Sequence, residues 1–248
     1  DKLSINKARI DTALKQMVTD GRAAGTSALI WKDGREVYFG TSGEADREAK
    51  RPMRRDTIIQ IFSMTKPVTG VALMQLWEQG KFGLDDPIAT YLPEFANMQT
   101  SAGTDANGVV RYRAASRQIT IRDVMRHTAG FANSGAETPA HVAYTKADPS
   151  ALDHDLAEMG RRLATVPLLY DPGERWYYGI APDVQALLIE KISGQPYAAY
   201  VKQHIFDPLG MKDTAWRQPD ENFARFSARY NLQKGKLVRV ADDINKTL

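Results

Sequence analysis

The segment Ser63-Met64-Thr65-Lys66-Pro67 is the feature of this sequence that most constrains its fold. Proline is tolerated in the first turn of a helix and breaks a helix further in, so a helix must begin near Ser63. Residues three apart on a helix are neighbours, and this spacing brings the Lys66 amine to the Ser63 hydroxyl without help from the rest of the fold. The pair predicts a serine nucleophile that is activated by lysine instead of histidine, and hence acyl-transfer chemistry.

Two features of its surroundings favour Ser63 as a nucleophile. The apolar run over residues 58–62 is expected to bury it, and the helix that follows is apolar enough to be central in a domain. At the N-terminus of that helix, backbone N–H groups without helical partners can stabilise an oxyanion. We expect the Ser63 N–H to form one half of an oxyanion hole.

The four-residue spacing alone is a weak signal, because the chain carries it twice. The second copy, Ser4-Ile5-Asn6-Lys7, is interpreted as a serine N-cap on an exposed amphipathic helix over residues 4–20, with a solvated lysine. An N-cap serine followed by a snorkelling lysine is also the alternative interpretation of Ser63.

A second informative segment lies more than a hundred residues downstream. There a Pro-Gly turn runs into an aromatic cluster, Asp171-Pro172-Gly173-Glu174-Arg175-Trp176-Tyr177-Tyr178, and a helix is predicted from about Asp183 to Ser193. With the Ser63 segment it resembles the penicillin-recognising serine hydrolases, specifically the family VIII carboxylesterases and their class C β-lactamase and D-peptidase relatives. The segments that resemble the family, these two included, follow one another in the family's order: residues 56–67, 84–87, 119–130, 172–194 and 207–211.

The resemblance assigns roles to individual side chains. It implies that Ser63 is the nucleophile, Lys66 its partner and Tyr178 the second basic group, with Tyr177 as the competing candidate. Lysine and tyrosine both have reference pKa values of about 10, so burial and mutual charge must perturb the pair before it can take the serine proton. Residues expected to contact the substrate are Trp176, Tyr177, Ile180 and Phe131.

Ile180 stands where the β-lactamase and peptidase relatives carry an asparagine. Isoleucine neither donates nor accepts a hydrogen bond, so a site that contains it should discriminate poorly for amide-bearing acyl donors. The predicted function is therefore that of a serine carboxylesterase acting on small or short-acyl esters. Two alternatives remain: a β-lactamase, D-peptidase or acyltransferase that uses the same acyl-enzyme, and a non-catalytic binding module on the same fold.

The histidines are assigned structural places. His127 is predicted to end a short helix that is capped at Thr120, where a hydrogen-bonded structural histidine belongs, and it becomes a candidate base only if Lys66 is irrelevant. His141, His154 and His204 lack metal-ligand spacing, and no Gly-rich phosphate loop is present. No metal and no cofactor are expected.

The expected partner is a small-molecule ester, as the resemblance implies, and composition argues against other classes of partner. The net charge of +3 is mild and the basic residues are scattered among acidic ones, which argues against nucleic acid. No apolar stretch reaches the length of a membrane span. Without cysteine the chain has no disulfide or thiol nucleophile, and it is compatible with the bacterial cytoplasm or the periplasm.

The predicted fold class is α/β, a β-lactamase-like fold with an antiparallel sheet flanked by helices and a helical subdomain. Residues 1–60 would begin the sheet domain with a hairpin around the Asp33-Gly34 turn, residues 61–215 would form the helical subdomain with the catalytic motifs, and residues 216–248 would return toward the sheet. Residues 96–118 are predicted as a long surface loop with a small hairpin at 109–113.

After Gly210 the sequence predicts only one further strand, over residues 236–240. Two strands do not make a stable sheet by themselves, and the resemblance implies further C-terminal strands. We therefore expect the C-terminal strands of the sheet to be missing from this chain, with a second polypeptide as one possible source of them. A chain of this length by itself is expected to be unstable and weakly active.

Overall fold

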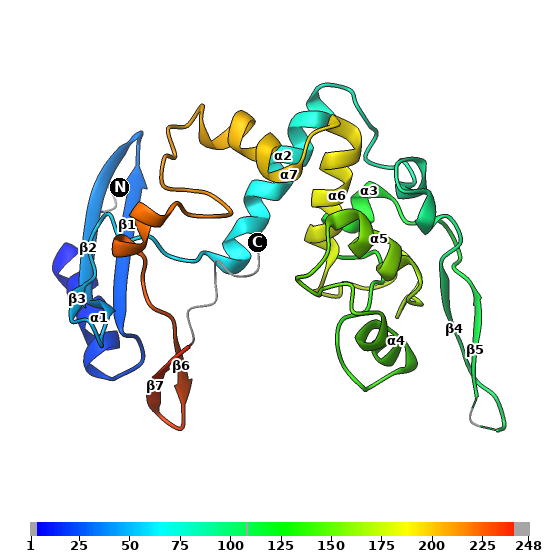
Figure 1. Ribbon diagram of the computed structural model, residues 1–248, viewed down its shortest axis with the longest axis horizontal. Helices are drawn as coiled ribbons and strands as arrows, with labels where there is room; N and C mark the ends of the chain where they lie inside the picture. Colours follow the sequence, from blue (N-terminus) through cyan, green and yellow to red (C-terminus); the bar gives the residue numbers. More distant parts are fainter. Residues whose placement is uncertain (1–3, 108, 241–248) are drawn as a thin grey trace. The chain divides into compact units, whose positions relative to one another are not determined.

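A computed structural model of the chain describes residues 4–107 and 109–240 (Figure 1). The chain divides into two compact units. The first, here called the sheet unit, consists of Asp1–Ile61 and Trp216–Leu248. The second, here called the helical unit, is the continuous segment Phe62–Ala215.

The sheet unit is built on a hairpin of two long antiparallel strands. Lys32 pairs with Arg35, which leaves Asp33 and Gly34 as a two-residue turn with φ values of 51° and 74°. A turn with both central residues at positive φ matches the right-handed twist of the flanking strands. The predicted Asp-Gly hairpin is confirmed, and its second strand is longer than predicted. The strands of this sheet, in order, are β1 (Gly25–Lys32), β2 (Arg35–Asp46) and β3 (Arg51–Pro52).

One helix, α1 (Lys7–Thr19), packs against the hairpin. Asn6 is its N-cap, and the Asn6 side chain accepts a hydrogen bond of 3.0 Å from the Arg9 N–H. The predicted cap at Ser4 is wrong. The helix begins at Lys7, later than expected, because the residue before it, Asn6, is itself of a strongly capping type. The exposed Ser4 lies outside the helix.

A second hairpin closes the described part of the sheet unit. Its two-residue turn is Lys234-Gly235, again with both φ values positive. Sequence analysis finds only the second strand, because the first is a short, mostly polar segment without clear alternation. Arg239 Nη1 lies 2.8 Å from Asp46 Oδ1, so this hairpin is tied to the end of β2 by an ion pair. The strands are β6 (Tyr230–Gln233) and β7 (Lys236–Arg239).

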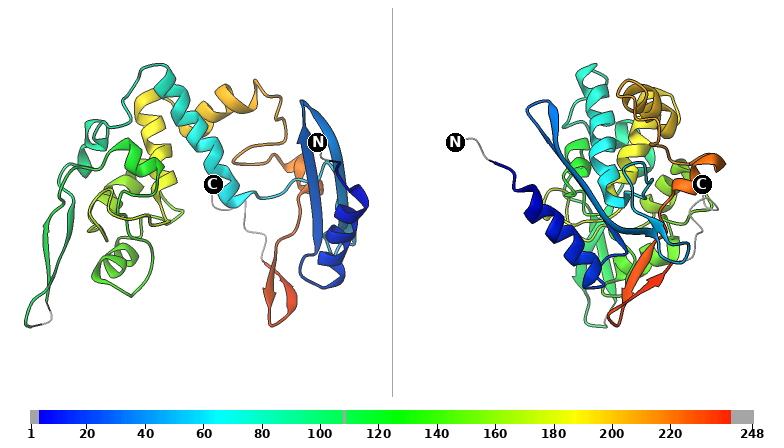
Figure 2. Two further views of the ribbon diagram at one scale, coloured as in Figure 1. Left: turned by 180° about the vertical axis from the view of Figure 1, so that it is seen from behind. Right: turned by 90° about the vertical axis from the view of Figure 1, so that its left-hand side faces the viewer.

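The helical unit is organised around α2 and α6, which pack side by side (Figures 1 and 2). Ala72 and Leu73 of α2 are completely buried, which confirms the prediction of a central helix. α6 is also buried along most of its length and ends at Gly194, whose φ of 73° is the left-handed conformation typical of a helix C-terminus. The helices are α2 (Thr65–Glu78), α3 (Ile121–Met125), α4 (Pro139–Ala147), α5 (Leu156–Ala164), α6 (Ala181–Ser193) and α7 (Tyr197–Val201).

Shorter helical turns complete both units. A π-helical turn, Lys202–Phe206, continues α7. The 3-10 turns are Phe62–Met64, Ile88–Thr90, Pro93–Phe95 and, in the sheet unit, Asp220–Arg225.

Residues 96–118, predicted as a long surface loop with a small hairpin at 109–113, instead form a longer hairpin, which extends from the helices in Figure 1 and in the left view of Figure 2. Its strands are β4 (Gln99–Thr104) and β5 (Val110–Ala114). The prediction fails at β4 because a tertiary contact holds this polar strand. The Leu168 N–H donates to Gln99 O at 2.7 Å, and Thr100 is only 3% exposed.

Leu152, Leu156, Met159 and Leu163 recur at a spacing that predicts one amphipathic helix, but α5 begins only after Leu152. Asp155 caps α5 by accepting a hydrogen bond of 2.8 Å from the Glu158 N–H. Leu152 precedes this cap and is 69% exposed, whereas Met159 and Leu163 are buried as predicted. The capping aspartate, rather than the apolar period, therefore sets the helix start.

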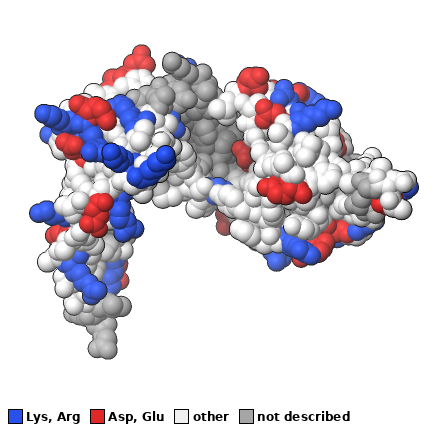
Figure 3. Space-filling view, turned by 90° about the horizontal axis from the view of Figure 1, so that it is seen from below, with Lys and Arg blue, Asp and Glu red and all other residues white. Residues whose placement is uncertain are grey.

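None of the helices within residues 4–107 and 109–240 is long and apolar enough to cross a membrane. Basic and acidic side chains are interspersed on the face of the molecule shown in Figure 3.

Candidate active site

Ser63 lies in the 3-10 turn that leads into α2. The α-helix itself begins at Thr65, so Pro67 falls in its first turn, where proline is tolerated. Met64, not Ser63, is the N-cap, and its side chain makes no capping hydrogen bond. Phe62 has a φ of 46°, a conformation that is costly for an aromatic residue and that often marks functional sites. The Ser63 side chain is therefore not used to cap the helix.

Three side chains of the helical unit meet at Ser63. Lys66 Nζ donates to Ser63 Oγ at 2.9 Å, and Ser63 Oγ lies 2.8 Å from Tyr178 Oη, which comes from a position 115 residues further along the chain. Lys66 Nζ also lies 4.6 Å from the centroid of the Tyr178 ring. The geometry thus joins the three residues that the resemblance singles out.

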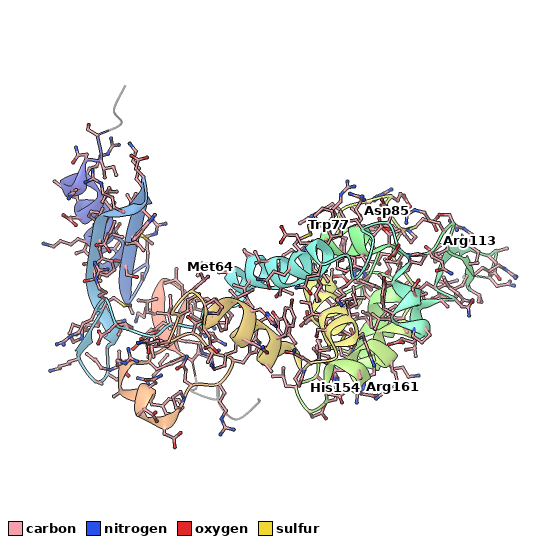
Figure 4. All side chains as sticks on the ribbon, turned by 90° about the horizontal axis from the view of Figure 1, so that it is seen from above. Met64, Trp77, Asp85, Arg113, His154 and Arg161 are labelled. Carbon is pink, nitrogen blue, oxygen red and sulfur yellow. The ribbon has the colours of Figure 1, made fainter. Side chains whose placement is uncertain are left out.

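The expectation that the preceding apolar run buries Ser63 is wrong. Ser63 is exposed, and Ile59 and Phe62 are 43% and 62% exposed. Of this run only Ile58 is buried, because its backbone pairs with Arg225 and Ser227 of the sheet unit. The serine is reachable from solvent at the start of α2, near Met64 in Figure 4, and Met64 is itself 61% exposed.

The surroundings of Tyr178 favour its ionised form. A hydrogen bond to Lys66 is the main cause that lowers the pKa of Tyr178, and the hydrogen bond with Ser63 lowers it further. The Lys66 charge acts in the same direction, whereas partial burial raises the pKa by a smaller amount. Tyr178 is therefore the hydroxyl of this cluster best prepared to accept the Ser63 proton.

Tyr177, the competing candidate, has different partners. Its hydroxyl donates to Asn133 Oδ1 at 3.1 Å and lies 2.9 Å from His141 Nε2. With Tyr177 already donating to Asn133, the His141 nitrogen is the donor of the second bond. Tyr177 is thus held by residues near α4 and not by Ser63, and this contact fixes the backbone next to Tyr178.

A short ladder of backbone hydrogen bonds places Tyr178. It joins the loop after α3 to the segment before α6: Tyr177 N–H donates to His127 O at 2.8 Å, Gly173 N–H to Thr128 O at 2.7 Å and Leu169 N–H to Gly130 O at 2.8 Å. Gly130 has a φ of 86°, and a Cβ there would collide with the Tyr170 carbonyl oxygen. The close approach of the two segments therefore requires glycine at this position.

A buried carboxylate anchors this loop. Asp123 is 5% exposed and binds Arg117 through both oxygens, at 2.6 Å and 2.9 Å. It also accepts hydrogen bonds from the N–H and hydroxyl of Thr120, and from the Thr128 hydroxyl at 3.2 Å. Burial raises the pKa of Asp123, but Arg117 and Thr120 outweigh it and the net pKa is lowered. The predicted cap at Thr120 is confirmed, as a full capping box with Asp123.

An ion pair ties the β4–β5 hairpin to the turn before Tyr178. Arg113 of β5, labelled in Figure 4, contacts both carboxylate oxygens of Asp171, which also accepts a hydrogen bond of 2.8 Å from the Ser116 N–H. The Arg113 bond and then the Ser116 bond lower the pKa of Asp171 to about 2. The roles of Arg113, Arg117 and Asp123 are not evident from the sequence, because only the folded structure shows which charged side chains pair.

The four residues expected to contact substrate lie in different surroundings. Trp176 is 65% exposed and its ring centroid lies 6.2 Å from that of Tyr178. Tyr177 is half-buried. Phe131 is 5% exposed and packs edge to face against Phe95. Ile180 is 6% exposed at the N-cap of α6. Trp176 is therefore the one of the four whose side chain is open to solvent beside Tyr178.

His127 follows α3 as predicted and lies next to the site. Its ring stacks on Tyr178, with centroids 5.2 Å apart and an interplanar angle of 16°. Burial, and then the nearby Lys66 charge, lower the pKa of His127. Across the part of the chain that the structure describes, no group of three or more His, Cys, Asp and Glu side chains is arranged to hold a metal ion.

Comparison with known proteins places this chain in a family. The model of a family described as Beta-lactamase matches residues 10–247. The chain is 34% identical to Esterase EstB from Burkholderia gladioli over 245 residues, which are 97% of this chain and 59% of that protein.

Two solved structures share the fold. One is EstCE1, described as a hydrolase with promiscuous acyltransferase activity, at 29% identity and a TM-score of 0.78, covering 95% of this chain and 59% of that one. The other is unliganded simvastatin synthase (LovD) from Aspergillus terreus, at 25% identity and a TM-score of 0.79, covering 96% of this chain and 62% of that one. The β-lactamase-like fold predicted from the sequence is confirmed, and the chain spans about three fifths of the length of these relatives.

Proposed function

The chain belongs to the beta-lactamase family, and we propose that it acts as a serine carboxylesterase on small or short-acyl esters. One observation carries the proposal: Ser63 Oγ lies 2.9 Å from Lys66 Nζ and 2.8 Å from Tyr178 Oη. A nucleophile within hydrogen-bond reach of its base, with a third group orienting that base, is the arrangement that activates a serine.

The direction of the hydrogen bonds defines the path of the proton. A charged lysine can only donate, so Ser63 Oγ accepts from Lys66 and turns its own proton toward Tyr178 Oη. Lys66 also lowers the pKa of Tyr178, which makes the phenolate available as a general base.

The reaction then proceeds in two halves. Tyr178 takes the Ser63 proton as Oγ attacks the ester carbonyl carbon, and the bond between that carbon and the alcohol oxygen breaks while Tyr178 returns the proton to the departing alcohol. In the second half water attacks the acyl-enzyme, its proton passes to Tyr178, and Ser63 regains a proton as the carboxylic acid leaves. The N-terminus of α2 and the Ser63 N–H would stabilise the oxyanion in both halves.

Ile180 supports esters over amides as substrates. Its side chain is buried at the start of α6, two residues after Tyr178, and it has no hydrogen-bonding group. An amide-bearing acyl group would lose its hydrogen bonds to water there without replacement. The name of EstB, an esterase, supports the same substrate class.

Transfer of the acyl group to an alcohol is the second candidate. Ser63 and Trp176 are both exposed, so an acceptor other than water can reach the acyl-enzyme. Promiscuous acyltransferase activity is described for EstCE1, and simvastatin synthase is a fold neighbour. Hydrolysis and transfer would share the same first half-reaction.

The proposal is tested with a fluorophosphonate probe and with substrates. The protein is labelled, its intact mass is recorded to identify the polypeptide that carries the probe, and the modified residue is mapped. We expect labelling at Ser63 that Ser63→Ala abolishes and Ser4→Ala, the matched control, leaves intact. Turnover is then measured with an activated short-acyl ester, with and without an acceptor alcohol, and with a chromogenic cephalosporin.

Each result points to one function. Fast ester cleavage and negligible cephalosporin cleavage support the carboxylesterase, and an alcohol-dependent ester product supports the acyltransferase. Faster cleavage of the cephalosporin would replace the carboxylesterase with a β-lactamase. An intact, folded protein that is not labelled at all would favour a non-catalytic binding module.

A further inference from the structure

His127 has no part in the reaction steps proposed for Ser63, yet it is held against the site. It follows α3 with a φ of 58°, a left-handed conformation that is uncommon for residues other than glycine. The ladder bond from Tyr177 N–H to the His127 carbonyl, 2.8 Å long, fixes this backbone directly before Tyr178. A strained backbone that persists beside a reactive group is a reason to look for a function.

Among the aromatic rings of the described residues that contact Tyr178, the His127 ring lies nearest to parallel with the phenol ring. The two rings stack at 5.2 Å and 16°, whereas Trp176 meets Tyr178 at 6.2 Å and 38° and meets His127 at 6.1 Å and 54°. The three rings form one aromatic cluster, in which His127 covers a face of the phenol. Stacked rings restrict one another's rotation, because turning either ring gives up the contact.

The surroundings of His127 disfavour the charged form of its ring. Within the described residues, the buried Nδ1 atom has no hydrogen-bond partner, so a charged imidazolium would bury a polar N–H group without an acceptor. It would also add a positive charge close to Lys66, and both effects lower the pKa of His127.

We propose that His127 is a positioning residue for Tyr178: its ring stacks against the phenol and holds Tyr178 Oη on Ser63 Oγ. His127 acts through Tyr178 and touches neither the reacting atoms nor the substrate. The inference rests on the proposed acyl-enzyme function of Ser63, and it replaces the alternative in which His127 is itself the base. Loss of the ring would let Tyr178 rotate and lengthen the 2.8 Å contact on which proton transfer depends.

The test compares His127→Ala with His127→Phe. Both variants place a Cβ in the same left-handed backbone, so they share its strain and differ only in the stacking ring. The measured quantities are the rate of fluorophosphonate labelling at Ser63 and kcat and KM for an activated short-acyl ester. Circular dichroism and the thermal midpoint establish that each variant is folded.

We expect His127→Ala to lower kcat and the labelling rate by about 10- to 100-fold with KM nearly unchanged, because orientation of the base is lost while binding is kept. His127→Phe should recover the labelling rate to within about threefold of the parent, since a flat ring is restored. If His127→Ala does not fold, His127→Asn takes its place, because asparagine tolerates the left-handed conformation, and the same loss is expected.

Two outcomes would overturn the inference while leaving the proposed function standing. One is a parent and a His127→Ala variant that label Ser63 at the same rate. The other is a folded His127→Phe variant as slow as His127→Ala, which would assign the effect to a ring nitrogen and not to stacking. A parent protein that is not labelled at Ser63 would instead overturn the proposed function, and this inference with it.

Discussion

The chain contains two Ser-x-x-Lys segments, and the structure treats them in opposite ways. At Ser4 and Lys7 both side chains are exposed, and Asn6 between them caps the helix. At Ser63 and Lys66 the two side chains meet at 2.9 Å, and Tyr178 completes the cluster. The same spacing thus gives an ordinary helix start in one place and a candidate nucleophile in the other. What separates them is a third group brought from a distant part of the chain.

The largest expected difference between the two segments is in the role of lysine. Lys66→Ala should lower kcat/KM for an activated ester by about 10³-fold, because it removes both the donor to Ser63 and the charge that favours the Tyr178 phenolate. Lys7→Ala, the matched control, should change kcat/KM by less than about twofold, since Lys7 is exposed at the start of α1. Equal losses of kcat/KM in the two variants would contradict a special role for Lys66.

The next largest effect is expected at the two adjacent tyrosines, of which Tyr178 contacts Ser63 and Tyr177 does not. Tyr178→Phe should lower kcat by about 10²-fold through loss of the proton acceptor, with little change in the thermal midpoint. Tyr177→Phe should act on stability, by about 1 kcal/mol, because it breaks hydrogen bonds to Asn133 and His141. Steady-state kinetics and thermal unfolding of the two variants separate these roles. A greater loss of kcat in Tyr177→Phe would reverse the assignment.

A third prediction concerns Asp123, the buried carboxylate that anchors the loop beside the Ser63 site. Asp123→Asn should lower the free energy of unfolding by about 2 kcal/mol at neutral pH, because a buried, charge-assisted network loses its carboxylate. Asp85→Asn is the control. Asp85 also pairs with an arginine, Arg122, but its side chain is 75% exposed, and its loss should cost much less stability than the loss of Asp123. Urea titration of both variants measures the difference.

The same pair of variants has a defined pH dependence. The pKa of Asp123 is lowered in the folded state, so the unfolded chain takes up a proton first as the pH falls. The stability that Asp123 contributes is present above its ordinary pKa of 3.8 and is lost as the pH falls through the lower, folded value. The gap between the parent and Asp123→Asn should therefore be constant near neutrality and narrow below about pH 4. A gap that widens in acid would contradict the sign of this pKa shift.

The smallest effect is expected within the first segment itself. Asn6→Ala should lower stability by about 1 kcal/mol, the usual cost of removing an N-cap, because Asn6 accepts the Arg9 N–H. Ser4→Ala should leave the thermal midpoint unchanged, since Ser4 lies outside the helix. A loss of stability in Ser4→Ala but not in Asn6→Ala would instead identify Ser4 as the cap.

Local patterns in the sequence predict much of the architecture. The Asp33-Gly34 turn, the cap at Thr120 and the end of α6 at Gly194 are found where the sequence places them. Each depends on backbone preferences of a few consecutive residues, which act in the same way in any fold. Predictions fail where a distant partner decides: β4 is a strand because Leu168 binds it, and Ser63 is exposed because only Ile58 of the preceding run is buried.

The sequence by itself determined that a serine and a lysine share the start of a helix, because proline and the helical repeat act over a few residues. The resemblance favoured Tyr178 over the adjacent Tyr177, and the sequence placed His127 only at the end of a short helix. Only the tertiary structure decided which groups these residues contact: the backbone ladder after α3 brings Tyr178 to Ser63, Tyr177 to His141 and the His127 ring onto the phenol. The physical reason is distance along the chain: short-range preferences place each group on its own element, and only packing brings elements together to within hydrogen-bond reach.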